Sequence, residues 1–205
     1  MTQAAAILGG YLLGSLPFGY WLVHLFSGED IRTRGSGNVG ASNVFRHFGR
    51  RLGIAVALLD LGKGFAAALL GLWAGGALVG VLAGAAAMLG HARPVFLGFR
   101  RGGKMVATAG GAALALAPLA ALSCVGVWLL VFLVARYASV ASIVTALALP
   151  LFAWLYGDSW PVFVFAAGGA AAIVLLHRNN IRRLFAGTEH RFQLSRARRA
   201  KRLPG

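Results

Sequence analysis

The sequence predicts an all-α polytopic membrane protein with seven transmembrane helices, its N-terminus outside and its C-terminus in the cytoplasm. Hydrophobic residues make up 59% of the 205 positions, charged residues make up 12%, and the mean hydropathy is +0.74. Such a composition lies outside the range of soluble domains. Repeated apolar runs approach the roughly 20 residues that cross a bilayer. All but one of the 20 Lys and Arg residues lie between or after these runs, as they do in cytoplasmic membrane loops.

The candidate spans follow the apolar runs in order and form a single membrane domain, 1–205. Pro17 lies inside the first span and is expected to kink it, because proline has no backbone N–H. The third and fourth spans are short, which is tolerated where a helix end lines a cavity. The spans are 4–26, 52–74, 77–90, 105–117, 118–135, 139–156 and 160–176, followed by a basic cytoplasmic tail over 177–205.

The run 105–135 is long for one crossing and short for two. If it turns near Pro118, the segments on the inner side hold 19 of the 20 Lys and Arg residues, and Lys63 is the remaining one. If it crosses once, the basic tail lies outside, against the positive-inside rule. The charge distribution therefore favours seven spans.

The net charge of +15 raises the possibility of a nucleic-acid partner. The basic residues alternate with apolar spans, so we expect contact with membrane lipid and no nucleic-acid binding. Cys124 is the single cysteine, which excludes an intrachain disulfide. The first 31 residues contain no Lys or Arg, so the first span is expected to be retained rather than cleaved as a signal peptide.

A small, polar, glycine-rich stretch lies between the first two spans, from Arg34 to Arg46. Its glycines allow backbone N–H groups to converge on one point, and arginine adds planar donors. This combination indicates an anion site, and phosphate is the usual anion. The alternative is a flexible basic loop. The candidate ligands in this stretch are Ser36, Gly37, Asn38, Ser42, Asn43 and Arg46.

A second polar block opens the fourth span with Gly102, Gly103 and Lys104, and Thr108 follows one turn later. Glycines before a lysine at a helix N-terminus direct amide groups, the helix dipole and an ammonium at one anion. The alternative is an ordinary basic loop turn. His91 closes the third span beside this block and is a further candidate.

A third polar block runs from His177 to Arg191 after the last span. His177 and Asn180 are three residues apart, so both could point into the bundle. Glu189 is the carboxylate of the tail, and it is expected to pair with an arginine and to be a substrate ligand. The basic run 191–202 is explained by attraction to anionic lipid headgroups.

Ser139 and Ser142 begin the sixth span on one helical face. No G-x-S-x-G elbow marks either as a nucleophile, so they are interpreted as hydrogen bonders to a ligand or a neighbouring helix. Asp60 and Lys63 lie three residues apart inside the second span, where ionisable residues are costly. They form either a structural ion pair or a support for the site. No grouping has metal-ligand spacing, so we expect neither metal nor cofactor.

These blocks resemble the PlsY family, the acyl-phosphate-dependent glycerol-3-phosphate acyltransferases of bacterial membranes. The first block is similar to the family's SGN-x-GATN-x-x-R, and three further stretches are similar to D-x-x-KG, GH-x-x-P-x-F-x-x-F-x-GGKGVAT and HR-x-NI-x-RL-x-x-G-x-E. The stretches that carry the resemblance are SGNVGASNVFR at 36–46, LLDLGKG at 58–64, GHARPVFLGFRRGGKMVAT at 90–108 and HRNNIRRLFAGTEHR at 177–191.

Two departures from the family pattern lie in these blocks. Ser42 replaces a threonine and keeps the hydroxyl. The second block carries an additional residue near Arg101, and Met105 stands where the family usually has glycine.

The resemblance implies transfer of a fatty acyl group from acyl phosphate to the sn-1 hydroxyl of glycerol 3-phosphate. The products are lysophosphatidate (1-acylglycerol 3-phosphate) and phosphate, in the first step of phospholipid synthesis. It implies a monomer in the bacterial inner membrane with its site facing the cytoplasm. Acyl phosphate is already activated, so positioning and charge neutralisation suffice, without an acyl-enzyme. The implied catalytic residues are Ser36, Arg46, Lys104, His177 and Asn180.

The identity of the base stays open between His91, His177 and an oxygen of a substrate phosphate. The H-x-x-x-x-D signature of acyl-CoA-dependent acyltransferases is absent, since His24 and Glu29 have the spacing with the wrong acid. The alternative from another class is a transporter for phosphate or an organophosphate. Such a protein is expected to show related halves, and no internal repeat is visible.

Overall fold

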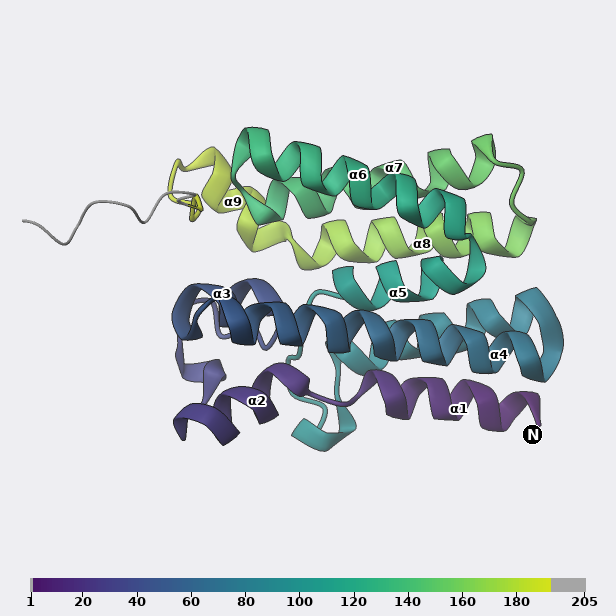
Figure 1. The fold of residues 1–205 in the computed structure, drawn as a ribbon, viewed down its shortest axis with the longest axis horizontal. Helices are drawn as coiled ribbons and strands as arrows, with labels where there is room; N and C mark the ends of the chain where they lie inside the picture. Colours follow the sequence, from purple (N-terminus) through teal and green to yellow (C-terminus); the bar gives the residue numbers. More distant parts are fainter. Residues whose placement is uncertain (1, 193–205) are drawn as a thin grey trace, which may run out of the picture.

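The computed structural model describes residues 2–192, and every regular element in that range is a helix (Figure 1). The predicted all-α class is confirmed. The part of the basic tail from 193 onward lies outside the described residues. The elements are α1 (Gln3–Gly14), α2 (Phe18–Ser27), η1 (Ile31–Thr33), α3 (Ala41–Phe48), α4 (Arg50–Ala92), η2 (Val95–Leu97), α5 (Val106–Leu116), α6 (Pro118–Ala135), α7 (Ala138–Leu155), α8 (Trp160–Leu176) and α9 (Arg178–Phe185).

The first apolar run is interrupted at Pro17, as predicted, and forms two helices, α1 and α2. The break exposes backbone acceptors that a continuous helix would satisfy. Lys63 Nζ donates a hydrogen bond of 2.8 Å to the Leu16 carbonyl oxygen at this break. The buried lysine of the second apolar run therefore stabilises the break in the first.

Helix α4 folds back on itself at Gly75 and Gly76, which leave helical geometry (φ 74° and ψ −163° at Gly76). Its first arm covers 50–74 and its second arm 77–92, and the two run side by side in opposite directions (Figure 1). A side chain on Gly71 would collide with the Val79 backbone. Glycine is thus required where the two arms approach most closely.

Small residues also bring the neighbouring helices close to α4. Gly14 of α1 packs on the Ala87 backbone of the second arm, and Gly64 of the first arm packs on the Thr108 backbone of α5. Membrane helices associate through such close contacts because lipid offers no hydrophobic gain for association. The result is a layer of α1, α4 and α5, covered on one side by α6, α7 and α8 (Figure 1).

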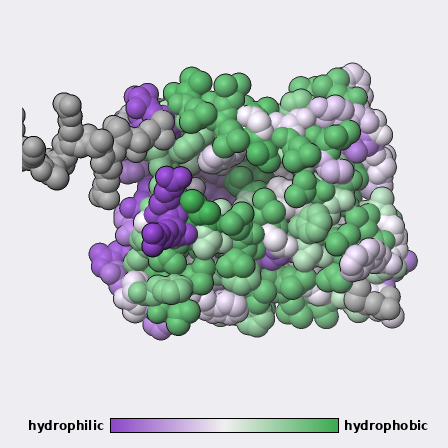
Figure 2. Space-filling model, viewed as in Figure 1, coloured by the Kyte–Doolittle hydropathy of each residue, from purple (hydrophilic) through white to green (hydrophobic). Residues whose placement is uncertain are grey.

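The surface is that of an integral membrane protein. Large apolar side chains face outward, among them Leu25, Trp73 and Trp160, each more than 70% exposed. Hydrophilic residues gather at the end of the molecule where α3 and α9 lie (Figure 2).

Within residues 2–192, four helical segments are long and apolar enough to cross a membrane, and Trp160–Leu176 joined to Arg178–Phe185 at a 55° bend makes a fifth. The chain is therefore multi-pass. The number of seven crossings and the orientation stay predictions. The four segments are Gln3–Ser27, Arg50–Leu97, Pro118–Ala135 and Ala138–Leu155.

Candidate active site

A cavity of about 440 Å³ lies between the α3–α4–α5 side of the molecule and the α6–α7–α8 side. The surface is hollowed there, beside the hydrophilic end (Figure 2). All three polar blocks predicted from the sequence contribute side chains to it. The predicted site residues that line the cavity are Ser36, Asn38, Ser42, Asn43, Arg46, Asp60, His91, Lys104, Ser142, His177, Asn180 and Glu189.

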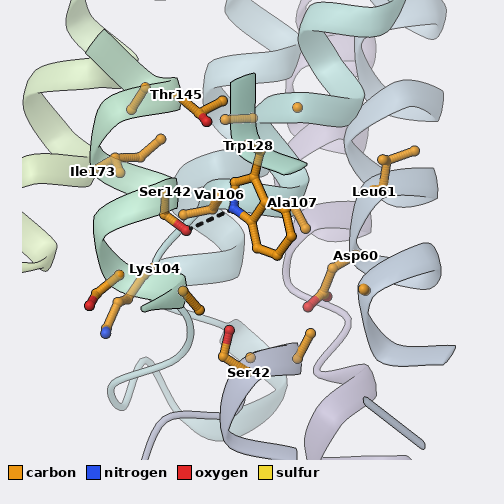
Figure 3. A pocket seen from close by; sticks show the side chains of 18 of the residues that line it. Ser42, Asp60, Leu61, Lys104, Val106, Ala107, Trp128, Ser142, Thr145 and Ile173 are labelled. Atoms are coloured by element: carbon orange, nitrogen blue, oxygen red, sulfur yellow. Dashed lines mark hydrogen bonds between the residues drawn. The ribbon is translucent and has the colours of Figure 1, made fainter. Parts of the chain in front are cut away.

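The first block is folded by its two asparagines. Asn43 Nδ2 donates to the carbonyl oxygens of Arg34 (3.0 Å) and Asn38 (2.9 Å), and Asn38 Nδ2 donates to the Gly102 carbonyl oxygen (3.1 Å). Both amides are thereby committed to the loop, and Asn38 ties it to the second block. The ligand-binding groups left in this block are the hydroxyls of the exposed Ser36 and Ser42 and the guanidinium of Arg46, and Ser42 points into the cavity (Figure 3).

The glycines of the second block do not present amides to an anion, contrary to the prediction. The Gly102 N–H donates to the Ala92 carbonyl oxygen and the Gly103 N–H to that of His91, each at 2.9 Å. Neither glycine lines the cavity. A side chain on Gly103 would collide with the His91 ring. These glycines are therefore required for close packing against the end of α4, which places Lys104.

Two further predicted ligands are structural. The Gly37 N–H donates to the Arg34 carbonyl oxygen at 3.0 Å, and the residue turns the chain at φ 67°. Thr108 is fully buried against Gly64 and does not line the cavity. The prediction that these two residues bind substrate is wrong, because the Gly37 N–H is already bonded to the protein, Thr108 is buried, and neither residue lines the cavity.

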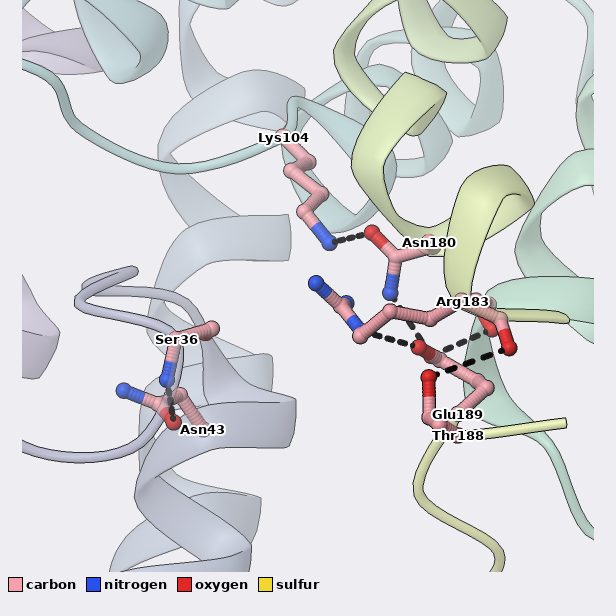
Figure 4. A network of polar contacts seen from close by, with 8 residues as sticks. Ser36, Asn43, Lys104, Asn180, Arg183, Thr188 and Glu189 are labelled. Atoms are coloured by element: carbon pink, nitrogen blue, oxygen red, sulfur yellow. Dashed lines mark hydrogen bonds and ion pairs between the residues drawn. The ribbon is translucent and has the colours of Figure 1, made fainter. Parts of the chain in front are cut away.

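The second and third blocks meet in one hydrogen-bond network (Figure 4). Lys104 Nζ donates to Asn180 Oδ1, and Asn180 Nδ2 donates to Glu189 Oε1 at 2.7 Å. Glu189 also accepts from Ser139 Oγ (2.8 Å) and Arg183 Nε (2.8 Å). The expected arginine pairing of Glu189 is confirmed. Its carboxylate also holds Asn180, which faces Lys104, and a role as a substrate ligand stays a prediction.

Charges at the polar end favour an anion. Burial lowers the pKa of Lys104 to about 8, while the Glu189 carboxylate raises it and Arg183 and Arg46 lower it. Burial also lowers the pKa of Arg46. Burial raises the pKa of Glu189, but hydrogen bonds from Asn180, Ser139 and Arg183 bring it below its usual value. Lys104 and Arg46 therefore line the polar end beside Glu189, whose carboxylate is already hydrogen-bonded, while the other carboxylate of the cavity wall, Asp60, is paired with Lys63.

The two histidines at the cavity have different hydrogen-bond partners. His177 Nδ1 lies 2.8 Å from the Ile173 carbonyl oxygen, which can only accept, so the proton of the neutral ring is on Nδ1 and Nε2 carries a lone pair. His91 Nδ1 lies 2.9 Å from Lys63 Nζ. An ammonium can only donate, so His91 Nδ1 accepts and the ring proton is on Nε2.

Asp60 and Lys63 form an ion pair of 2.7 Å and share a helix face, as their spacing predicted. Both side chains are at most 3% exposed. Asp60 and His91 line the cavity, whereas Lys63 lies behind them and reaches the α1–α2 break. The pair thus connects the cavity wall to the break between α1 and α2.

A model of the family described as glycerol-3-phosphate acyltransferase matches residues 4–187. The chain belongs to the glycerol-3-phosphate acyltransferase family. A relative of that name from Synechococcus sp. (strain JA-2-3B'a(2-13)) is 46% identical over 191 residues, covering 93% of this chain and 95% of the relative. A relative of that name from Aquifex aeolicus (strain VF5) is 45% identical, covering 94% of this chain and all of the relative. The match favours the enzyme over the transporter alternative.

Two solved structures share the fold. The crystal structure of PlsY (YgiH), an integral membrane glycerol 3-phosphate acyltransferase in its glycerol 3-phosphate form, has a TM-score of 0.89 and 44% identity, covering 93% of this chain and 96% of that one. Its lysophosphatidic acid form has a TM-score of 0.86 and 42% identity, with 93% and 95% coverage. The predicted resemblance is confirmed.

The departure from the family pattern at Met105 has a structural consequence. Met105 precedes α5 in the left-handed region, at φ 69°, where glycine is favoured. The glycine usual in the family suits this conformation, whereas this chain places a buried methionine there, 5% exposed, within the main apolar core. The backbone strain is offset by the packing of the side chain.

Sequence reasoning missed the apolar end of the cavity. Trp128 of α6 lies inside it and donates from Nε1 to Ser142 Oγ at 3.3 Å (Figure 3). Leu58 of α4 and Leu122 of α6 line it and are about 60% exposed, so the cavity opens toward lipid. From the sequence alone, an aromatic residue or leucine that lines a cavity cannot be told from one that faces lipid. No motif marks these residues.

Proposed function

We propose that this glycerol-3-phosphate acyltransferase uses a fatty acyl phosphate as donor and forms lysophosphatidate and inorganic phosphate. The observation that carries the proposal is the two-ended cavity. Lys104 and Arg46 make one end cationic, and the other end is apolar and open to lipid. A fatty acyl phosphate has the matching two parts, an anionic phosphate and an apolar chain. The polar acceptor glycerol 3-phosphate needs only the cationic end.

Phosphate is held by side chains and helix starts, since the glycine amides of the second block are committed elsewhere. Lys104, Arg46 and the Ser36 hydroxyl supply donors. The first turns of α3 and α5 line the cavity at Ala41 and Ala107, and N–H groups at helix starts have no intrahelical partner. Asn180 orients the acceptor, and Glu189 orients Asn180.

The reaction is a direct acyl transfer. The sn-1 hydroxyl oxygen attacks the acyl carbonyl carbon and forms the ester bond. The bond between that carbon and the phosphate oxygen breaks, and the phosphate leaves with the electron pair. Lys104 and Arg46 stabilise the charge that develops on the leaving group. No enzyme nucleophile is needed.

Two acceptors can take the hydroxyl proton: His177 Nε2, which carries a lone pair, and an oxygen of a substrate phosphate. The contacts of His91 argue against it as the base, because its Nδ1 accepts from Lys63 and this puts the ring proton on Nε2.

The proposed topology has seven crossings with the site at the cytoplasmic face of the bacterial inner membrane. The fold-back of α4 at Gly76 supports two crossings there, and the break at Ala117 between α5 and α6 supports the predicted hairpin. An odd number of crossings puts the termini on opposite sides, with the basic C-terminal segment inside. The cavity is built by one chain, which supports a functional monomer.

The donor is tested by supplying purified protein with glycerol 3-phosphate and either palmitoyl phosphate or palmitoyl-CoA. Product from palmitoyl phosphate alone, lost in Lys104→Ala and kept in the exposed-site control Arg51→Ala, is the expected result. Product from palmitoyl-CoA alone would overturn the donor. No product from either donor, in protein with a cooperative thermal transition, would overturn the proposed activity.

A further inference from the structure

Asp60 is a buried carboxylate in the wall of the cavity. Its side chain is 3% exposed, and it comes from the first arm of α4. Its carboxyl group points into the cavity, on the side opposite Lys104 and with Ser42 between them (Figure 3). The mechanism above gives this carboxylate no role.

One oxygen of the Asp60 carboxylate has no partner within the described part of the chain. Oδ1 is paired with Lys63 Nζ at 2.7 Å and lies 3.5 Å from His91 Nδ1, whereas Oδ2 receives no hydrogen bond from residues 2–192. An ionised carboxylate has about four acceptor sites, and leaving them unfilled in a buried position is unfavourable. A donor from a bound molecule would fill them.

The surrounding cluster holds the carboxylate in place. Lys63 Nζ donates to the Leu16 carbonyl oxygen (2.8 Å) and to His91 Nδ1 (2.9 Å). The lysine is thus fixed by the α1–α2 break and by the end of α4, and it keeps the negative charge of Asp60 at one point of the cavity wall.

We infer that Asp60 accepts a hydrogen bond from the non-reacting C2 hydroxyl of the glycerol phosphate and makes the site selective for this polyol. The inference rests on the proposed function. A carboxylate repels phosphate and gains nothing from an acyl chain, so a hydroxyl is the substrate group that suits it. The reacting hydroxyl must lie near the leaving phosphate, hence on the Lys104 side, and the hydroxyl on the neighbouring carbon is the group left to turn toward Asp60.

The test compares two acceptors that differ in this hydroxyl alone. Propane-1,3-diol monophosphate keeps the phosphate and a primary hydroxyl but lacks the C2 hydroxyl. The wild-type kcat/KM is expected to favour glycerol 3-phosphate by about 10- to 100-fold, the range for a hydrogen bond to a charged group. In Asp60→Asn the preference is expected to fall to within about 3-fold.

Asp158→Asn is the matched control, because it alters a carboxylate in the turn between α7 and α8, away from the cavity; its preference is expected to equal the wild type. If Asp60→Asn fails to fold, the double variant D60N/K63Q removes both charges and serves instead. An unchanged ratio with a uniform loss of activity would overturn the inference in favour of a structural or base role. A wild type without preference would also overturn it, whereas a wild type that acylates neither acceptor would overturn the proposed function itself.

Discussion

Lys104 donates a hydrogen bond to Asn180 and thereby joins the start of α5 to the start of α9 across the cavity. Asn180 can do this because Glu189 accepts from its other amide atom, Nδ2, at 2.7 Å. With its amide bonded at both ends, Asn180 has one orientation. The polar end of the cavity is therefore preorganised before substrate binds.

Asn180→Ala is expected to lower kcat/KM by about 100-fold, because a preorganised polar group at a reacting centre contributes on that scale. Asn179→Ala is the matched control, since Asn179 is the neighbouring asparagine and does not line the cavity; it is expected to keep activity within about 3-fold. Steady-state rates of lysophosphatidate formation measure both. Equal effects of the two substitutions would contradict the role of Asn180.

The pH dependence of kcat/KM is expected to report Lys104. Burial lowers its pKa to about 8, so the ammonium is present below that pH and is lost above it. The log of kcat/KM for glycerol 3-phosphate is expected to fall by about one per pH unit above pH 8. Lys104→Arg, whose guanidinium stays charged, is expected to lack this fall while its rate is reduced. A wild-type profile that is flat to pH 10 would be inconsistent with a functional Lys104 ammonium.

Glu189→Gln is expected to shift that fall to lower pH. The Glu189 carboxylate raises the pKa of Lys104, so its neutralisation makes the ammonium easier to deprotonate. Arg178→Gln, which changes the charge of an exposed side chain in the same region, is the control. The pH profiles of the two variants and the wild type give the comparison. A midpoint that does not move in Glu189→Gln would show that the carboxylate and Lys104 are not coupled.

Gly103→Ala is expected to destabilise the protein by about 1 to 3 kcal/mol, because the added methyl group would collide with the His91 ring. Gly126→Ala is the control, since open space surrounds that position on α6, and it is expected to be neutral or stabilising by up to about 1 kcal/mol. Thermal unfolding in detergent measures both. Similar transition temperatures for the two variants would contradict the packing role of Gly103.

The sequence predicted the meeting of the polar blocks, because the positive-inside distribution puts Arg46, Lys104 and His177 on one side of the membrane. It misassigned the glycines. Gly102 and Gly103 are needed for close packing on His91 rather than for anion binding. Both roles call for glycines directly before the lysine, so the sequence pattern is the same for either role. It also could not show that Glu189 acts through Asn180, because the path of the eight intervening residues and the hydrogen bonds from Ser139, Asn180 and Arg183 decide this. Trp128 was missed because a single aromatic residue in an apolar run does not show whether its side chain faces the cavity or the lipid.

The most direct measurement follows inorganic phosphate and lysophosphatidate together, with palmitoyl phosphate and glycerol 3-phosphate as the substrates. Direct transfer predicts that the two products form in equal amounts and that neither forms without glycerol 3-phosphate. Phosphate release in the absence of glycerol 3-phosphate, as a burst or as steady hydrolysis, would contradict the account. Lysophosphatidate formed without phosphate release would contradict it as well.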